Sequence, residues 1–324
     1  MRVRVDTGAR VHIGFQNLSL AHERLYGGVG IAIDSPRVVL EAEPADRVVC
    51  DDGLVARCAA RSCELLGVDG VAIDPVETLP RHVGLGSGTQ TALAALAAVA
   101  GVHDRSPEIR ELAPSLGRGG RSGVGVGTFE AGGFVIDAGH PTERFTTTPP
   151  DSGEWSVPAV SVRQDLPPEW RFLVVVPDAD AGRSGEDENE SIRSVVERAD
   201  PSIADSLATL SIRRLLPAVA EGKLEAFGDA IGEFGRLNGA WYADEQGGVY
   251  RPPAGRLIDE LADSPAVRGV GQSSWGPVVY GVTNAASADA ARAAAEDALS
   301  SIGDDGSVRV VAPRNDGART TRLR

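Results

Sequence analysis

The sequence predicts a mixed α/β or α+β fold in two domains, and three observations support this prediction. Strand-like and helix-like segments alternate along both halves of the chain. The length of 324 residues suits one large domain or two ordinary ones, and 42% of the residues are hydrophobic, enough for a sizeable core. Between residues 141 and 168 the composition shifts to proline, threonine and serine, as in a loop or linker. We therefore expect a boundary near residue 165, between domains 1–165 and 166–324.

The first domain opens on a strand, because Val3, Val5, Val11 and Ile13 alternate with polar residues. Two more strands are expected on either side of a Ser35-Pro36 turn. These two strands cover residues 29–33 and 37–43. The predicted elements after them are a helix over 54–66 that Gly67 ends, a strand over 71–76, an alanine-rich helix over 88–100, a short helix over 107–116 and an apolar strand over 127–136.

The second domain begins with the apolar run RFLVVVP, which indicates a buried strand over 171–177. The segment GQSSWGP divides an apolar stretch over 267–282, which is typical of a hairpin. The other predicted elements are helices near 190–199, 201–220, 223–240, 253–262 and 286–301, and a last strand over 307–312.

The chain is acidic, with 46 Asp and Glu against 32 Lys and Arg and a formal charge of −14. Such a chain repels phosphate backbones and anionic lipids, so we expect no nucleic-acid or membrane partner. Lys223 is the only lysine, and the other 31 basic residues are arginine. This bias suits a halophilic protein, although codon bias would produce the same pattern.

Cysteine usage and hydropathy point to a cytoplasmic protein. Cys50, Cys58 and Cys63 are an odd number and contain no C-x-x-C pair, so neither a disulfide framework nor a zinc site is expected. The N-terminal residues contain no apolar core of a signal peptide. The longest apolar run, residues 91–102, is too short for a membrane span.

A first glycine loop, LPRHVGLGSGTQ over residues 79–90, lies between a predicted strand and a long helix. Glycines let a ligand approach the backbone, and the free amides of a helix start favour an anion such as phosphate. The loop lacks the lysine of a P-loop and does not complete the G-x-G-x-x-G fingerprint. It therefore indicates phosphate binding of another kind, or else a turn that only starts a helix.

A second glycine loop contains eight glycines between Gly117 and Gly133, together with Arg118 and Arg121. Arginine grips phosphate or carboxylate through two parallel hydrogen bonds, so this loop is a candidate anion site. A flexible surface loop with solvated arginines is the alternative. The GQSSWGP segment could close over both loops, or it could simply be a hairpin with a buried tryptophan.

Other candidate residues are less specific. His12 lies on the polar side of the first strand, where a histidine is more often structural than catalytic, and His82 and His140 lie beside glycine loops. The acidic run over 186–190 could hold magnesium, although acids at a helix start are favoured by the helix dipole alone.

Taken together, these loops resemble the GHMP kinase superfamily over most of the chain. The segment TGARVH over 7–12 is similar to its first motif, PRHVGLGSGTQTALA to its second, and GQSSWGP to its glycine-rich third motif. The resemblance implies an α+β, two-domain GHMP kinase-like fold, with a ribosomal S5 domain 2-like N-terminal domain and a ferredoxin-like C-terminal domain. The active site of that fold lies between the two domains.

One departure argues against an ordinary kinase. Many members carry a segment like P-S-G-x-D whose aspartate is the catalytic base, but here RSGVG over 121–125 has Gly125 at that position. Glycine cannot accept a proton from a substrate hydroxyl.

A more specific resemblance is to the β-ribofuranosylaminobenzene 5′-phosphate synthase family, which has the GHMP fold. The segments LGRGGRSGVGVGTFEAGGFVIDAGH, GVGIAID, GQSSWGPVVYG and QGGVYRP are similar to segments of that family. The resemblance implies that phosphoribosyl pyrophosphate is joined to 4-aminobenzoate or 4-hydroxybenzoate, with loss of CO2 and pyrophosphate, as in methanopterin biosynthesis. It also implies Mg²⁺ bound with the pyrophosphate, no organic cofactor and a homodimer, and it leaves the metal ligands unassigned.

The residues suit this chemistry, because a leaving pyrophosphate needs positive charge and N–H donors. Arg10, Arg24 and Arg183 are candidates for the ribose 5-phosphate, and an apolar pocket near Trp275 or Phe129 would desolvate the benzoate carboxylate. We predict catalytic roles for Arg121, Arg118, Ser122 and His12. The predicted binding residues are Gly84, Leu85, Gly86, Ser87, Gly88, Thr89, Gln90, Gly119, Gly120, Gly123, Arg10, Gln272, Ser273 and Ser274.

Two other functions remain open at this point. One is an ATP-dependent small-molecule kinase in which Asp137 or Glu130 replaces the missing aspartate. The other is a non-catalytic protein that binds a phosphorylated ligand, because a fold is weak evidence for any one chemistry.

Overall fold

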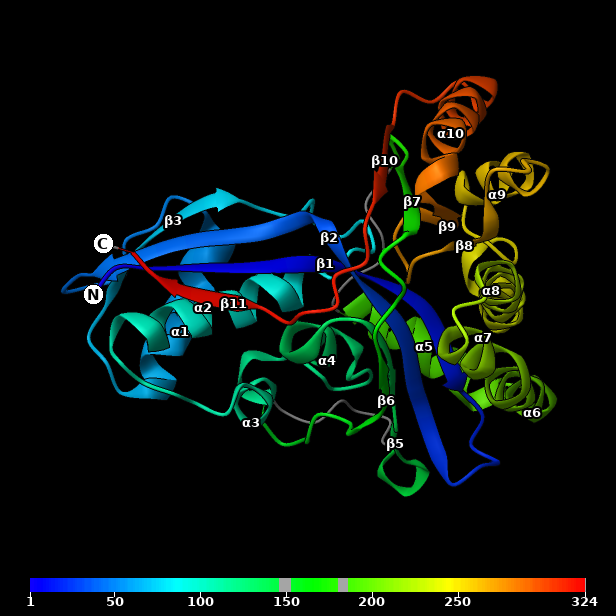
Figure 1. Ribbon diagram of the computed structural model, residues 1–324. Helices are drawn as coiled ribbons and strands as arrows, with labels where there is room; N and C mark the ends of the chain where they lie inside the picture. The colour runs from blue at the N-terminus through cyan, green and yellow to red at the C-terminus, as the bar shows by residue number, and fades with distance from the viewer. Residues whose placement is uncertain (146–152, 180–185, 324) are drawn as a thin grey trace.

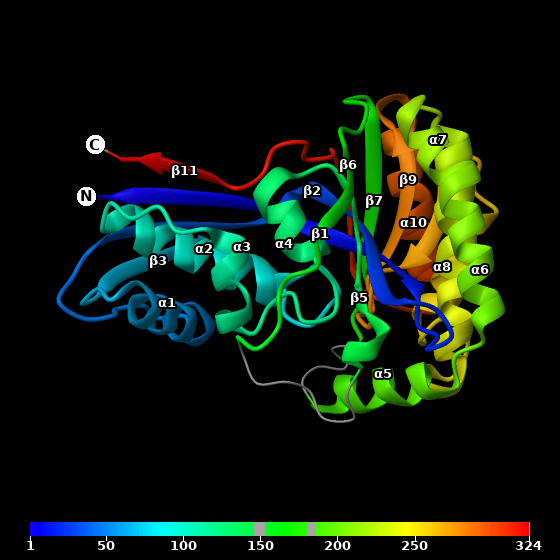
Figure 2. The ribbon, with the colours of Figure 1, turned by 90° about the horizontal axis from the view of Figure 1, so that it is seen from below.

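Two long strands, β1 (Val3–Asn17) and β2 (Arg24–Pro44), form an antiparallel ribbon that runs the length of the molecule (Figure 1). The computed structural model describes residues 1–145, 153–179 and 186–323. The apolar residues that alternate along β1 include Val3, Val5 and Val11, all fully buried. The ribbon begins beside the two chain termini and ends among the helices of the second half, so it connects both parts of the molecule (Figures 1 and 2).

The first sheet has seven strands in the order β11-β1-β2-β4-β6, with β3 and β5 also paired to β2. Helices α1 and α2 cover one face of the ribbon (Figure 1). The bounds of this half are α1 (Gly53–Leu66), β3 (Val71–Glu77), α2 (Ser87–Val102), α3 (Ile109–Leu112), the 3₁₀ turn Pro114–Leu116, α4 (Val124–Ala131), β4 (Phe134–Asp137), β5 (His140–Pro141), the 3₁₀ turn Thr142–Arg144, β6 (Val160–Gln164) and, from the end of the chain, β11 (Arg319–Arg322).

The second sheet has four antiparallel strands in the order β10-β7-β9-β8. Helices separate its first two strands and its last two, which is the βαββαβ arrangement of ferredoxin-like folds. The bounds are β7 (Trp170–Val176), α5 (Glu186–Arg198), α6 (Pro201–Leu210), a π-helical turn (Ser211–Leu215), α7 (Leu216–Ala220), α8 (Leu224–Gln246), α9 (Ala254–Ala262), β8 (Arg268–Gln272), β9 (Val279–Asn284), the 3₁₀ turn Ala285–Ser287, α10 (Ala288–Ile302) and β10 (Ser307–Val311).

The second sheet is buried on both faces, which explains the continuous apolar sequence of β7. Phe172 and Val174 belong to a core shared with the first sheet, whereas Leu173 and Val175 pack with α9 and α10. The shared core joins the two halves through aromatic contacts: the Phe227 ring of α8 lies 6.0 Å from Phe134 and 4.8 Å from Trp170. Within the described residues, no helix has both the length and the apolar character needed to cross a bilayer.

Most predicted elements are confirmed. The α1 helix ends at Gly67, which has a left-handed φ of 62°. The predicted hairpin is formed by β8 and β9, and the alanine-rich helices are α2 and α10. Strands up to β6 belong to the first sheet and β7 begins the second sheet, but β11 pairs with the first sheet again. The division at residue 165 stays a prediction.

Three local predictions were wrong, and one strand was not predicted. The two strands predicted around Ser35-Pro36 are one strand, β2, whose residues 34–36 form an irregularity at the point where Gly8 pairs with Arg37 and Ala9 pairs with Ile33. The predicted linker contains β6, and the unpredicted strand β11 follows the expected last strand. Residues 127–131 belong to helix α4 and not to a strand, because every second position from Gly123 to Gly127 is glycine and mimics strand alternation.

Candidate active site

The amino terminus of α2 is open to a ligand. Gly86 caps the helix with a left-handed φ of 76°, and within the described part of the chain no side chain caps it. Its first N–H groups therefore point outward beside the positive end of the helix dipole. Ser87 and Thr89 add hydroxyl groups in the first turn. This arrangement suits an anion, as the sequence predicted.

Two arginine side chains lie against this helix start. Arg10 donates from Nη1 to the Gly84 carbonyl oxygen over 3.0 Å. A Cβ at Gly88 would lie 2.9 Å from Arg118 Nη1, so the glycine leaves room for this guanidinium beside the helix start. The structure therefore brings Arg10 and Arg118 together at the anion site, where a guanidinium strengthens hydrogen bonds to phosphate.

The GQSSWGP segment closes onto the same loop from the second sheet. Ser273 Oγ donates to the Gly84 carbonyl oxygen over 2.7 Å and accepts from the His12 backbone N–H over 3.0 Å. The backbone N–H of Ser274 in turn donates to the His12 carbonyl oxygen over 3.2 Å. The two serines thus hold the first and third motifs together.

Three predicted binding residues support the loops from within. Leu85 is a buried core residue. Gln90 is also buried, and its Nε2 donates to the Gly125 carbonyl oxygen over 2.9 Å. Gln272 accepts from the Arg251 backbone N–H over 2.8 Å. Leu85 and Gln90 thus support the loops from inside the protein, whereas Gln272 also lines the pocket described below.

The second glycine loop approaches the site from the other side. Trp155 donates from Nε1 to the Arg118 carbonyl oxygen over 3.0 Å and packs against Gly120. Gly119 has a left-handed φ of 76° and lies against Val157. Arg121 donates to Asn189 Oδ1 of α5, so it links this loop to the second half of the chain.

A chain of hydrogen bonds joins His12, Ser122 and Asp137. His12 Nε2 lies 3.3 Å from Ser122 Oγ, and Ser122 Oγ donates to Asp137 Oδ2 over 3.1 Å. Backbone N–H groups also donate to this carboxylate, from Gly123 to Oδ2 over 2.7 Å and from Gly139 to Oδ1 over 2.8 Å. The serine therefore lies between a buried imidazole and a buried carboxyl group.

Burial changes the acid–base behaviour of both ends of this chain. It raises the pKa of Asp137 to about 6, although the N–H groups and Ser122 favour the ionised form. It lowers the pKa of His12 well below the ordinary value, and the neighbouring charge of Arg10 acts in the same direction. The His12 imidazole is therefore neutral at physiological pH.

An aromatic row borders this hydrogen-bond chain. The rings of His12 and Phe15 are 5.0 Å apart, Phe15 and Tyr26 5.5 Å, and Tyr26 and His140 6.3 Å. Tyr26 has a left-handed φ of 73°, which is strained for a residue with a side chain. Such strain is common at functional sites.

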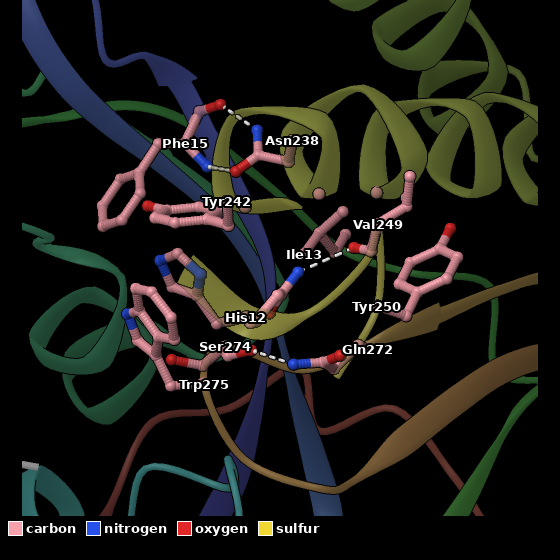
Figure 3. Close-up of a pocket in the computed structure, with 14 residues that line it drawn as sticks. His12, Ile13, Phe15, Asn238, Tyr242, Val249, Tyr250, Gln272, Ser274 and Trp275 are labelled. Carbon is pink, nitrogen blue, oxygen red and sulfur yellow. Dashed lines mark hydrogen bonds between the residues drawn. The ribbon is translucent and has the colours of Figure 1, made fainter. Parts of the chain in front are cut away.

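A pocket opens beside His12, between β1, α8 and the GQSSWGP segment (Figure 3). The cavity itself has a volume of about 50 Å³, and the whole hollow, including the part open to solvent, is about 450 Å³. Tyr242 and Trp275 form one wall, with ring centroids 4.7 Å apart, and Phe15 forms another. Figure 3 shows the His12 imidazole beside these rings. Aromatic walls of this kind favour contact with a flat aromatic ring, which would extend from the small cavity into the part open to solvent.

Several sequence-based candidates lie elsewhere. Phe129 is buried on α4 and lines a different hollow, with Ala318 and Thr320, so the pocket is the one near Trp275. Arg24 donates to the carbonyl oxygens of Ala138 and Gly139, which gives it a structural role. Arg183 and the acidic side chains of residues 186–188 lie outside the described residues.

No cluster of three or more potential metal ligands occurs among the residues described. Sequence reasoning missed Phe15 and Tyr242 at the site, gave Tyr26 no role, and named Asp137 only as a substitute kinase base. The strained backbone of Tyr26 and the pairing of Asp137 with Ser122 depend on tertiary contacts and leave no local signal.

Comparison with known proteins agrees with the fold. The family model "GHMP kinases N terminal domain" matches residues 53–133, and "GHMP kinases C terminal" matches residues 215–301. Homoserine kinase from Cytophaga hutchinsonii is similar in structure, with a TM-score of 0.66 and 17% identity over 99% of this chain and 97% of that one. Mevalonate kinase from Methanococcus jannaschii gives a TM-score of 0.65 and 14% identity over 96% and 98%. The predicted two-domain GHMP kinase-like fold is confirmed.

Relatives with a named activity narrow the family further than the fold does. The beta-ribofuranosylphenol 5′-phosphate synthase of Methanothermobacter thermautotrophicus is 32% identical over 97% of this chain and 97% of its own length. The protein of the same name from Archaeoglobus fulgidus is also 32% identical, over 87% and 88%. The chain therefore belongs to the beta-ribofuranosylphenol 5′-phosphate synthase family, a family of enzymes built on the GHMP kinase fold.

Proposed function

We propose that the chain joins phosphoribosyl pyrophosphate to 4-hydroxybenzoate, forming a carbon–carbon bond at the sugar C1 with loss of CO2 and pyrophosphate. The sequence left 4-aminobenzoate and 4-hydroxybenzoate open as acceptors. The relatives are named for a ribofuranosylphenol product, and a phenol product requires the hydroxy acid. We therefore propose that this chain catalyses the reaction for which these relatives are named.

The environment of Gly125 is the main observation that favours this proposal over an ordinary kinase. Its carbonyl oxygen accepts a hydrogen bond from Gln90, and a Cβ there would lie 3.1 Å from Thr89 Cγ2. A carboxylate base therefore has little room at this position. Glu130 is exposed and paired with Arg110, so it is a poor substitute, whereas Asp137 is fully buried and contacts Ser122.

The leaving pyrophosphate is assigned to the start of α2. The open N–H groups after Gly86 and the guanidinium groups of Arg10 and Arg118 would stabilise the negative charge that develops there. The aromatic acceptor is assigned to the pocket of Tyr242 and Trp275, whose apolar walls would weaken the solvation of its carboxylate and favour loss of CO2.

Magnesium is proposed to arrive with the pyrophosphate. Mg²⁺ commonly binds substrate phosphates and water with one or two protein carboxylates, so it needs no cluster of the kind absent among the described residues. When bound, it would neutralise charge on the leaving group. The homodimer, the halophilic adaptation and the cytoplasmic location stay predictions.

Ligand-induced thermal stabilisation tests the proposed substrate. Phosphoribosyl pyrophosphate with Mg²⁺, at one hundred times its Kd, should stabilise the protein by about 2.7 kcal/mol and raise its Tm by roughly 5 °C. ATP with Mg²⁺ should do much less. Arg118→Ala should lose most of the shift, whereas Arg61→Ala, which removes an exposed arginine paired with Glu64, should keep it. Stabilisation by ATP alone would support the kinase instead.

A further inference from the structure

The acceptor pocket and the buried carboxyl group lie on two sides of His12. The histidine lines the pocket together with Tyr242 and Trp275. Its Nε2 lies within hydrogen-bond distance of Ser122, whose hydroxyl donates to Asp137. Three side chains thus lead from the pocket wall to a carboxyl group that has no exposed surface.

The protonation states suit transfer along this chain. A neutral imidazole carries one N–H and one free acceptor nitrogen, so if His12 donates from Nε2 to Ser122, Nδ1 remains an acceptor. Burial keeps His12 neutral and makes Asp137 a stronger base than an exposed aspartate. The backbone donors Gly123 and Gly139 hold the carboxylate in place.

We propose that His12, Ser122 and Asp137 form a proton relay that takes up the hydroxyl proton of the benzoate bound in the pocket. This role rests on the proposed function. His12 is the group that contacts the acceptor, and Ser122 and Asp137 act through it. The relay explains why a site without a base at position 125 still contains a buried carboxyl group.

The relay balances over one turnover. The phenol O–H bond breaks, its proton passes to His12 Nδ1, the Nε2 proton passes to Ser122, and the Ser122 proton passes to Asp137. The phenolate electrons form the bond from the carboxyl-bearing ring carbon to the sugar C1, and the bond from C1 to pyrophosphate breaks. This leaves a ring dienone. Loss of CO2 returns the electron pair to the ring, and the proton returns from Asp137 to the product phenolate.

The test replaces Ser122 with alanine, which interrupts the relay and leaves His12 and Asp137 in the chain. General acid–base catalysis contributes about 100-fold or more, so kcat with 4-hydroxybenzoate should fall by about that factor. The KM for phosphoribosyl pyrophosphate should change less than about 3-fold, because the relay does not bind it. Ser62→Ala, a buried serine that donates to the Cys58 carbonyl oxygen, is the matched control and should keep full activity.

A second acceptor separates proton transfer from structural damage. In 3,5-difluoro-4-hydroxybenzoate the fluorines lower the phenol pKa, so much of the acceptor is already ionised at pH 8 and needs no base. The ratio of wild-type to Ser122→Ala activity should therefore drop from about 100 to under about 10 with this acceptor. Asp137→Asn, if folded, should behave in the same way.

The outcomes separate the relay from the proposed function. If the wild-type protein releases no pyrophosphate with 4-hydroxybenzoate, the proposed function fails. If the wild type is active and Ser122→Ala loses the same factor with both acceptors, or loses nothing, the relay is overturned while the function stands.

Discussion

At the scale of single residues, Asp137 is the most unusual group of the site. Its side chain is completely buried, yet the hydrogen-bond donors to it among the described residues are neutral N–H and O–H groups. Four donors favour the ionised form, from Gly28, Gly123, Gly139 and Ser122, but burial outweighs them and raises the pKa. Asp137 can therefore gain and lose a proton near neutral pH, as a proton store requires.

This pKa predicts a pH dependence of folding. The folded pKa of about 6 lies above the value of 3.8 for an ordinary aspartate, so folding favours the protonated form. The contribution of Asp137 is fully present below about pH 4 and is lost as the pH rises through 6, by about 3 kcal/mol in total. Urea unfolding should show the unfolding free energy of the wild type falling relative to that of Asp137→Asn by about this amount between about pH 3 and pH 7.

A carboxylate with the opposite shift provides the control. Asp200 caps α6 by accepting from the Ser202 N–H, which lowers its pKa. Its contribution is therefore present above about pH 4 and is lost as the pH falls, so Asp200→Asn should show the reverse trend. A wild-type to Asp137→Asn difference that stays constant with pH would contradict the assigned pKa.

The residues of the site could be predicted from sequence only in part. Arg10, Arg118, Ser122 and His12 were identified because they stand in or beside glycine-rich motifs, and the structure brings them together. The role of Asp137 could not be derived, since its contact with Ser122 spans fifteen residues and that of Ser122 with His12 spans 110. Contacts of this kind arise only when the β1–β2 ribbon meets β4 and the loop before α4.

At the scale of elements, the site depends on the contact between two loops from different sheets. Across this contact, the Val278 N–H and the Ser273 hydroxyl donate to carbonyl oxygens of the loop before α2. Close backbone packing between the loops keeps the open helix start beside His12. The glycine at position 276 makes that packing possible.

Replacing Gly276 with alanine should separate the loops. A Cβ there would lie 2.0 Å from the Val83 carbonyl carbon, and backbone cannot move aside as a flexible side chain can. Unfolding free energy should fall by at least about 1–3 kcal/mol, and the stabilisation by phosphoribosyl pyrophosphate should weaken. Gly53→Ala is the control, because the nearest atom is the flexible Arg57 Nη1 at 3.5 Å. A variant that matches the control in both measurements would show that the loop contact does not support the site.

Comparing the predicted elements with the observed ones shows where apolar periodicity predicts structure correctly and where it does not. Apolar periodicity located β7, α1 and α8, since burial of one or both faces determines their residues. It failed at α4, where Val124 and Val126 alternate with glycines in a helix packed against α2. It also failed at β11, whose Arg-Thr-Thr-Arg residues are all exposed and pair with β1 through the backbone. Backbone pairing without burial leaves no pattern in the sequence.

At the scale of the whole molecule, the β1–β2 ribbon unites the site. One end of the pocket is formed by β1 and the other by α8, where Asn238 Oδ1 accepts from the Phe15 N–H over 2.9 Å. The ribbon thus places the open start of α2, His12 and the aromatic pocket along one line between the two sheets. In the proposed reaction the phosphorylated sugar and the flat aromatic acid meet where these parts converge.

The measurement that tests this account most directly counts both leaving groups. Carboxyl-labelled 4-hydroxybenzoate, phosphoribosyl pyrophosphate and Mg²⁺ are incubated with the protein in high salt, and released CO2 and pyrophosphate are measured together. We expect one CO2 for each pyrophosphate, dependent on both substrates and absent when ATP replaces the sugar pyrophosphate. Pyrophosphate release that does not require the benzoate, or no release of either product, would contradict the account.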